Sequence, residues 1–161
     1  MILERFELVD MLNHVSDDLL QGEFLAKVPS KSPIFDGHFD DYPILPGVLS
    51  IEMIAQAAGF LILAYEKIEL MPFLMGVDQA RFKGFIEPGE TLTVTATLEH
   101  RGSGYWAAAG YVSRNSRKLT QAKLRLAIKD FPTPKMRQHI EDRMSELGVS
   151  SVADRVQEEV R

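Results

Sequence analysis

The chain has 161 residues, of which 45% are hydrophobic and 25% charged, a composition typical of one soluble globular domain and unlike that of a disordered chain. It contains no cysteine, which excludes disulfides and thiolate chemistry and gives no support for secretion. Acids and an arginine interrupt the first ten residues, MILERFELVD, so we expect no signal peptide and a cytoplasmic protein.

Basic residues are concentrated in one part of a chain whose net charge is −5. Nine bases and three acids lie between residues 81 and 129, a local excess of +6 that leaves −11 for the rest. This pattern favours a local anionic partner over nucleic acid, which usually meets an overall basic domain. The alternative is that the bases only form solvated strand faces. The nine are Arg81, Lys83, Arg101, Arg114, Arg117, Lys118, Lys123, Arg125 and Lys129.

The N-terminal half predicts a strand, a loop and a helix. Residues 6–12 favour a short helix or strand, and residues 23–28 alternate like a strand. Residues 29–47 hold four prolines, two glycines and three aspartates, which predicts a long shaped loop of the kind that often carries function. The almost wholly apolar residues 48–65 then predict a buried central helix. Their length fits a membrane span, but Glu52, Gln56 and the lack of flanking cations argue against one.

The C-terminal half predicts a sheet followed by helices. Residues 91–98 alternate polar and apolar, as do residues 119–128, with turns expected near residues 101–104 and 113–117. The fold class is therefore α+β, an antiparallel sheet against one long helix. We divide the chain into a domain of residues 1–130 and a C-terminal extension of residues 131–161. The extension predicts amphipathic helices that stop at Gly148 and restart near Ser150 or Ser151.

Acid–base chemistry is the chemistry that the residues favour. The sequence contains no two histidines at a metal-ligand spacing and no phosphate-binding loop. We therefore expect no metal and no cofactor. Glu52 lies in an apolar helix, where a carboxylate must find hydrogen-bond partners or hold a proton near neutral pH. Gln56 follows one turn later on the same face. A carboxylate satisfied by backbone or a loop is the alternative, and His38 alone is an ordinary loop residue.

The segment G-H-F-x-x-x-P-x-x-P-G-V-L-x-I-E-x-x-A-Q combines these residues from Gly37 to Gln56. It strongly resembles the 3-hydroxyacyl-(acyl carrier protein) dehydratases of bacterial fatty-acid synthesis. The resemblance covers about four fifths of the chain, from Arg5 to about Ile128, and also includes residues 76–83 and 88–90. It implies a hot-dog fold, in which the sheet wraps around the helix, and dimers, often assembled as trimers of dimers, whose active sites combine histidine from one subunit with glutamate from the other.

The resemblance also implies roles for individual residues. His38 is expected to act as base and Glu52 as acid, while the backbone N–H of Gly47 at the helix start binds the thioester carbonyl. Val48 and Gln56 are expected to contact substrate, and Phe73, Phe82 and Met53 to line an acyl tunnel, although core packing explains these last three equally well. Arg81 and Lys83 are candidates for docking acyl carrier protein, with coenzyme A as the competing carrier.

Two departures from the family pattern stand out. Asp40 replaces the proline that usually follows the His-Phe pair, and an acid so close to His38 would favour its protonated form and weaken it as a base. The tail beyond Phe131 is an addition. A hot-dog thioesterase and a non-catalytic acyl-binding or carrier-binding homologue therefore remain alternatives. The isomerising dehydratases typically carry aspartate at the position of Glu52, so we expect dehydration without isomerisation.

Overall fold

The computed structural model describes residues 1–39 and 41–150. The first half contains a short 3-10 helix and two strands, then a one-turn helix and the long helix α2. The second half contains four strands and the helix α3. The elements are η1 (Leu3–Arg5), β1 (Met11–Val15), β2 (Gln21–Lys27), α1 (Pro33–Asp36), α2 (Gly47–Tyr65), β3 (Met71–Phe82), β4 (Thr91–Gly102), β5 (Tyr105–Arg114), β6 (Arg117–Lys129) and α3 (Pro134–Leu147).

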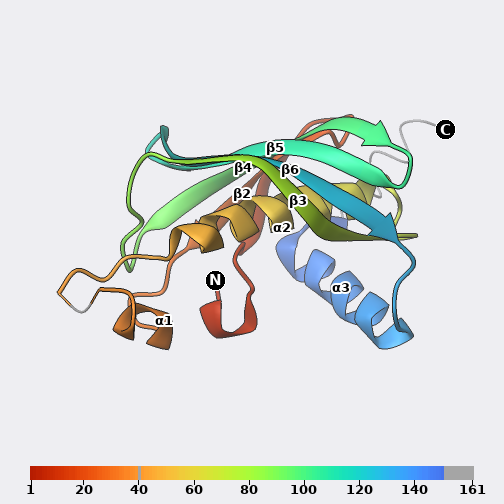
Figure 1. Cartoon of the computed structure of the whole chain (residues 1–161). Helices are drawn as coiled ribbons and strands as arrows, with labels where there is room; N and C mark the ends of the chain where they lie inside the picture. The colour runs from red at the N-terminus through yellow and green to blue at the C-terminus, as the bar shows by residue number, and fades with distance from the viewer. Residues whose placement is uncertain (40, 151–161) are drawn as a thin grey trace.

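The six strands form one antiparallel sheet in the order β1-β2-β4-β5-β6-β3, and the sheet curves over α2 (Figure 1). The hairpins β4–β5 and β5–β6 are joined at the turns that the sequence predicts, and the helix begins one residue before the predicted apolar run. The predicted α+β class with a central helix against an antiparallel sheet is therefore confirmed.

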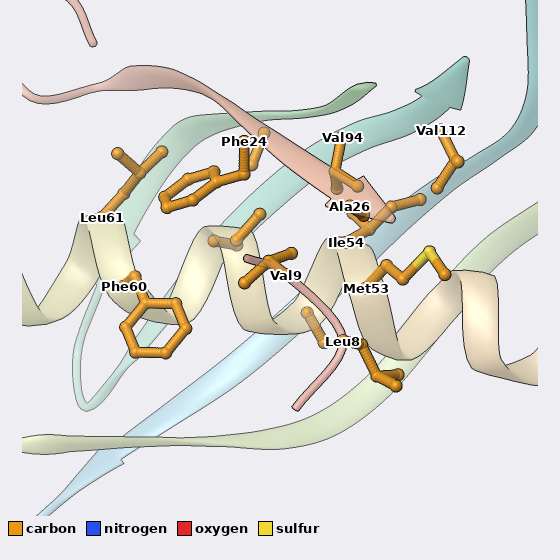
Figure 2. Close-up of a cluster of buried hydrophobic side chains, with 14 of the residues drawn as sticks. Leu8, Val9, Phe24, Ala26, Met53, Ile54, Phe60, Leu61, Val94 and Val112 are labelled. Carbon is orange, nitrogen blue, oxygen red and sulfur yellow. The ribbon is translucent and has the colours of Figure 1, made fainter. Parts of the chain in front are cut away.

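The core lies between the concave face of the sheet and α2. Side chains from the helix, such as Ile54 and Leu61, pack against strand residues, including Phe24 and Val94, and against Val9 from the N-terminal segment (Figure 2). The helix packs tightly against the sheet at Gly110, where a Cβ atom would lie 2.4 Å from Ile54 Cγ2 and 2.6 Å from the Thr95 carbonyl oxygen. Only glycine allows this approach.

Helix α2 is the core helix of this fold. It is long and apolar enough to cross a membrane, yet 67% of its most apolar 18-residue stretch is buried inside the protein. This burial is consistent with a soluble protein. The expectation that the whole helix is buried is wrong for its first two turns, because Val48 is 66% exposed and Glu52 is half-buried. The loop before the helix and the sheet cover these turns on one side only.

Strand β3 forms one edge of the sheet and pairs with β6 alone among the described strands. It is twelve residues long and carries exposed apolar side chains. Its Pro72 lacks a backbone N–H and is therefore tolerated at an edge. A long, apolar, unpaired edge is unusual on a monomer because it offers a template for another strand. These side chains are Phe73, Leu74, Met75, Val77 and Phe82.

The two ends of the domain differ in part from expectation. The sequence predicts a short helix or strand over residues 6–12, but the 3-10 helix ends before Phe6 and strand β1 starts at Met11. The loop of residues 29–47 contains the short helix α1. Helix α3 ends at Gly148, whose φ of 80° is the left-handed conformation that stops a helix. The helix predicted to restart near Ser150 or Ser151 would continue through residues 151–161, which lie outside the described residues.

Candidate active site

The ring of His38 is held by the loop that precedes α2. Its Nδ1 lies 2.9 Å from the carbonyl oxygen of Ile44. Since a carbonyl oxygen only accepts hydrogen bonds, Nδ1 carries the hydrogen and donates it. In the neutral ring this leaves the lone pair on Nε2. The fold therefore selects the tautomer in which Nε2 can accept a proton.

The loop around His38 is fixed by several contacts. The Tyr42 hydroxyl donates to Glu87 Oε1 over 2.9 Å, and the Leu45 N–H donates to the Ile86 carbonyl over 2.7 Å. Phe39 stacks beside His38 with ring centroids 4.6 Å apart. Its φ of 68° is a left-handed conformation that is uncommon for an aromatic residue and costs energy. The effect expected of Asp40 cannot be followed, because that residue lies outside the described ones.

The start of α2 faces the same pocket as His38. Gly47 is the first helical residue, so its N–H has no acceptor within the helix. The ring of Phe82 lies against it, 3.0 Å from the place where a Cβ atom would be. A buried hydroxyl pair, which the sequence analysis missed, supports this turn: Ser50 Oγ donates to the Gly47 carbonyl over 2.6 Å and lies 2.8 Å from Thr120 Oγ1.

Glu52 is oriented by Gln56, as the spacing of one helical turn suggests. The Gln56 amide nitrogen donates to Glu52 Oε1 over 3.0 Å and to the Phe6 carbonyl over 2.6 Å. The Gln56 amide oxygen accepts the N–H of Leu8 over 3.0 Å. These backbone partners fix which end of the amide is the donor. Glu52 Oε1 is therefore an acceptor, and a proton on this carboxyl group sits on Oε2.

His38 and Glu52 line two different pockets of the chain. The His38 pocket also contains Gly47, Phe82 and Lys83. The Glu52 pocket runs along the other side of α2 and contains Gln56. Within the described part of the chain, the pocket that contains His38 and the pocket that contains Glu52 share no residue. In one subunit the two side chains therefore open into separate cavities.

The other predicted substrate contacts separate in the same way. Val48 is exposed beside Gly47, and Phe82 lines the His38 pocket. Phe73 is 37% exposed near the opposite end of β3. Met53 is fully buried in the core and lines neither the His38 pocket nor the Glu52 pocket, which favours the alternative that it packs in the core.

The two residues predicted to dock a carrier protein also differ in position. Lys83 is exposed at the rim of the His38 pocket. Arg81 instead lies in a groove on the sheet with Lys118 and Lys123. Several bases of the same region are neutralised by ion pairs, which join Arg101 to Glu66, Arg114 to Glu90 and Arg125 to Asp78. Of the bases between residues 81 and 129, Lys83 is thus the one that lines the His38 pocket.

No group of three or more His, Cys, Asp or Glu side chains that could hold a metal ion occurs within residues 1–39 and 41–150.

Comparison with known proteins identifies the family. The model of the ApeI-like dehydratases matches residues 14–117. The chain belongs to this dehydratase family. It is also 34% identical to the 3-hydroxyacyl-(acyl-carrier-protein) dehydratase FabZ of Nitrosospira multiformis over 142 residues, which cover 79% of this chain and 97% of the relative. The FabZ enzyme of Histophilus somni is 37% identical over 141 residues, with 78% and 92% covered.

Solved structures confirm the hot-dog fold expected for this family. A mutant of a thioesterase from Staphylococcus aureus matches with a TM-score of 0.60 at 20% identity, covering 79% of this chain and 97% of that one. The dehydratase heterocomplex ApeI:P from Xenorhabdus doucetiae matches with a TM-score of 0.56 at 18% identity, covering 73% and 97%. Both thioesterases and dehydratases share this fold, so the reaction must be argued from the family and the site.

Proposed function

We propose that this dehydratase removes water from 3-hydroxyacyl thioesters carried by acyl carrier protein and forms trans-2-enoyl thioesters in lipid synthesis in the cytoplasm. The proposal is supported by the hydrogen bonds of two side chains, one suited to accept a proton and the other to donate one. His38 presents a free Nε2, and Glu52 presents a free Oε2. A base and an acid are what this elimination requires.

The reaction assigns one proton to each group. His38 Nε2 accepts the proton from C2 of the substrate, and the charge that develops on the thioester oxygen is stabilised by the N–H of Gly47 at the positive end of α2. The C3–O bond then breaks, Glu52 gives its proton to the departing hydroxyl group, and C2 and C3 form the double bond. Water leaves, and the proton from C2 returns through His38 to solvent or to Glu52.

A homodimer supplies the shared site in this proposal. Pairing of two β3 edges by a two-fold axis would cover the exposed apolar side chains of Met75 and Val77 and continue the sheet. The same axis would carry His38 of one subunit toward Glu52 of its partner. This arrangement accounts for the exposed first turns of α2, and trimers of such dimers are a further expectation from the family.

The proposed carrier is acyl carrier protein. Its acidic surface would meet Lys83 at the rim of the His38 pocket, with Arg81 further along the sheet. We also propose that residues 1–130 form the catalytic domain and residues 131–161 its extension, since α3 follows the last strand of the sheet.

The test is an assay of the purified protein with 3-hydroxyacyl thioesters, in which the enoyl product is followed by ultraviolet absorbance and free thiol by a colorimetric reagent. We expect enoyl product without thiol release. His38→Asn is the informative variant, because an Asn amide can still donate to the Ile44 carbonyl but offers no base, and we expect at least about a hundredfold loss of kcat. Thiol release would indicate a thioesterase, and binding without any turnover a non-catalytic homologue.

A further inference from the structure

The Glu52 pocket runs along α2 and is lined on one side by α3. Its cavity volume is about 240 Å³. The pocket starts at Glu52 and Gln56 and follows one stripe of α2 through Gly59 to Leu63. The eleven steps along the helix from Glu52 to Leu63 span about 16 Å. The pocket is therefore elongated along α2, and an apolar stretch follows Glu52 and Gln56. Polar and charged side chains, those of Arg5, Glu7, His139 and Arg143, also line the pocket.

Apolar side chains from three further elements line this course. Pro72 and Leu74 come from β3, Leu126 from β6 and Ile140 from α3. Helix α3 lies beside α2 on the side that the sheet leaves open (Figure 1). A methylene chain that enters from Glu52 would exchange water for these apolar walls, which is favourable for each carbon buried.

Helix α3 is held firmly enough to act as a wall. Arg143 donates from Nη2 to the carbonyl of Val9 over 2.6 Å, which ties the helix to the N-terminal segment. Met144 and Leu147 are fully buried, and Val149 is almost fully buried just after the helix. The family match ends at residue 117, so α3 lies beyond it.

We infer that this pocket receives the hydrocarbon end of the substrate and that α3, through Ile140, limits the length of the acyl chain that the enzyme accepts. The inference rests on the proposed function, since it places the acyl chain beyond Glu52. Ile140 is the specificity-determining residue, because it is the apolar one of the three α3 residues that line the pocket, the others being His139 and Arg143.

The experiment measures how the ratio kcat/KM depends on acyl chain length for the wild type, Ile140→Trp and Ile140→Ala, with 3-hydroxyacyl thioesters as substrates. Met136→Ala is the matched control, since Met136 lies one turn earlier on α3 and does not line the pocket. We expect Ile140→Trp to lose at least about tenfold on the longer chains and nothing on the shortest one. Ile140→Ala should shift the optimum to longer chains, and the control should keep the wild-type profile.

Two outcomes separate this inference from the proposed function. Length profiles that coincide for the wild type and both Ile140 variants, at normal activity on the shortest substrate, would overturn the role of α3. If the wild type turns over no thioester, the proposed function fails, and calorimetric titration with the same thioesters then decides the inference. Affinity that rises with chain length and is truncated in Ile140→Trp supports the pocket, whereas equal affinity at every length contradicts it.

Discussion

His38 and Glu52 lie on opposite sides of the first turns of α2 and open into different pockets of the same chain. Each is oriented by contacts within its own subunit, His38 through the Ile44 carbonyl and Glu52 through Gln56. In the proposed function the two halves of the site are built separately and meet when two subunits associate, for which the exposed apolar edge of β3 offers a surface.

The role of Gln56 is tested by Gln56→Leu. This change removes the donor to Glu52 and leaves the Leu8 N–H and the Phe6 carbonyl without their side-chain partner. We expect kcat to fall by about ten- to a hundredfold, because Glu52 loses its orientation, and the free energy of unfolding to fall by about 1–3 kcal/mol. Enzyme kinetics and chemical denaturation measure the two effects.

The control for this variant is Gln138→Leu, at an exposed position on α3. It should change stability by no more than about 0.5 kcal/mol and leave kcat unaltered. If Gln56→Leu keeps wild-type kcat while its stability falls, Gln56 is a structural residue only.

Electrostatic docking is tested at Lys83. Because Lys83 is exposed beside the His38 pocket, Lys83→Ala should raise KM for acyl-carrier-protein substrates several-fold at low salt, and the effect should shrink at high salt as screening increases. The same acyl group on the uncharged carrier N-acetylcysteamine should show no such effect. Lys129→Ala is the matched control, since Lys129 is the last residue of β6 and does not line the His38 pocket. Equal KM changes for both variants would contradict the docking role.

Acid sensitivity is expected from Glu66, which closes the C-terminal end of α2. Hydrogen bonding from Arg101, supported by Trp106, lowers the pKa of Glu66 below its ordinary value of 4.5. A carboxyl group whose pKa is lower in the folded state stabilises the fold fully above the unfolded pKa and loses this contribution as the pH falls through the folded pKa. Glu66→Gln should therefore cost about 1 kcal/mol near pH 7 and much less near pH 3.

Denaturation of wild type and Glu66→Gln at both pH values measures this difference. A gap in the free energy of unfolding that stays constant with pH would assign the effect to packing or to the uncharged hydrogen bonds instead of to ionisation.

The close approach of α2 to the sheet is tested by Gly110→Ala. The new Cβ would meet the Thr95 carbonyl oxygen as well as Ile54, and backbone cannot move aside as easily as a flexible side chain. We expect a loss of about 1–3 kcal/mol in the free energy of unfolding. Gly59→Ala is the control, because its Cβ would lie at an ordinary 3.6 Å from Pro72 and alanine favours a helix. Equal stability of the two variants would contradict this account.

Periodicity predicted the elements whose environment is simple. The apolar run of α2 follows from the burial of the helix beyond its first two turns, and the alternation in β4 and β6 follows from the burial of one face of each strand. Strand β3 shows no such pattern, because Pro72 and two register shifts interrupt it and several of its apolar residues are exposed. At β3 the sequence favours association with another subunit, because the single chain leaves its apolar residues exposed.

The site was predictable only where local spacing determines it. Gln56 follows Glu52 by one helical turn, and their contact is present as predicted. The hydroxyl pair of Ser50 and Thr120 joins residues 70 positions apart, so no local pattern indicates it. The position of Ile140 beside α2 depends in the same way on how α3 docks.

The shared site is tested most directly by combining two inactive subunits. A heterodimer of His38→Ala and Glu52→Ala chains, purified through two different tags, contains one site with both substitutions and one intact site with His38 from the second chain and Glu52 from the first. We predict about half of the wild-type turnover, because one of two symmetric sites is restored. A heterodimer no more active than either parental variant would contradict a site built from two subunits.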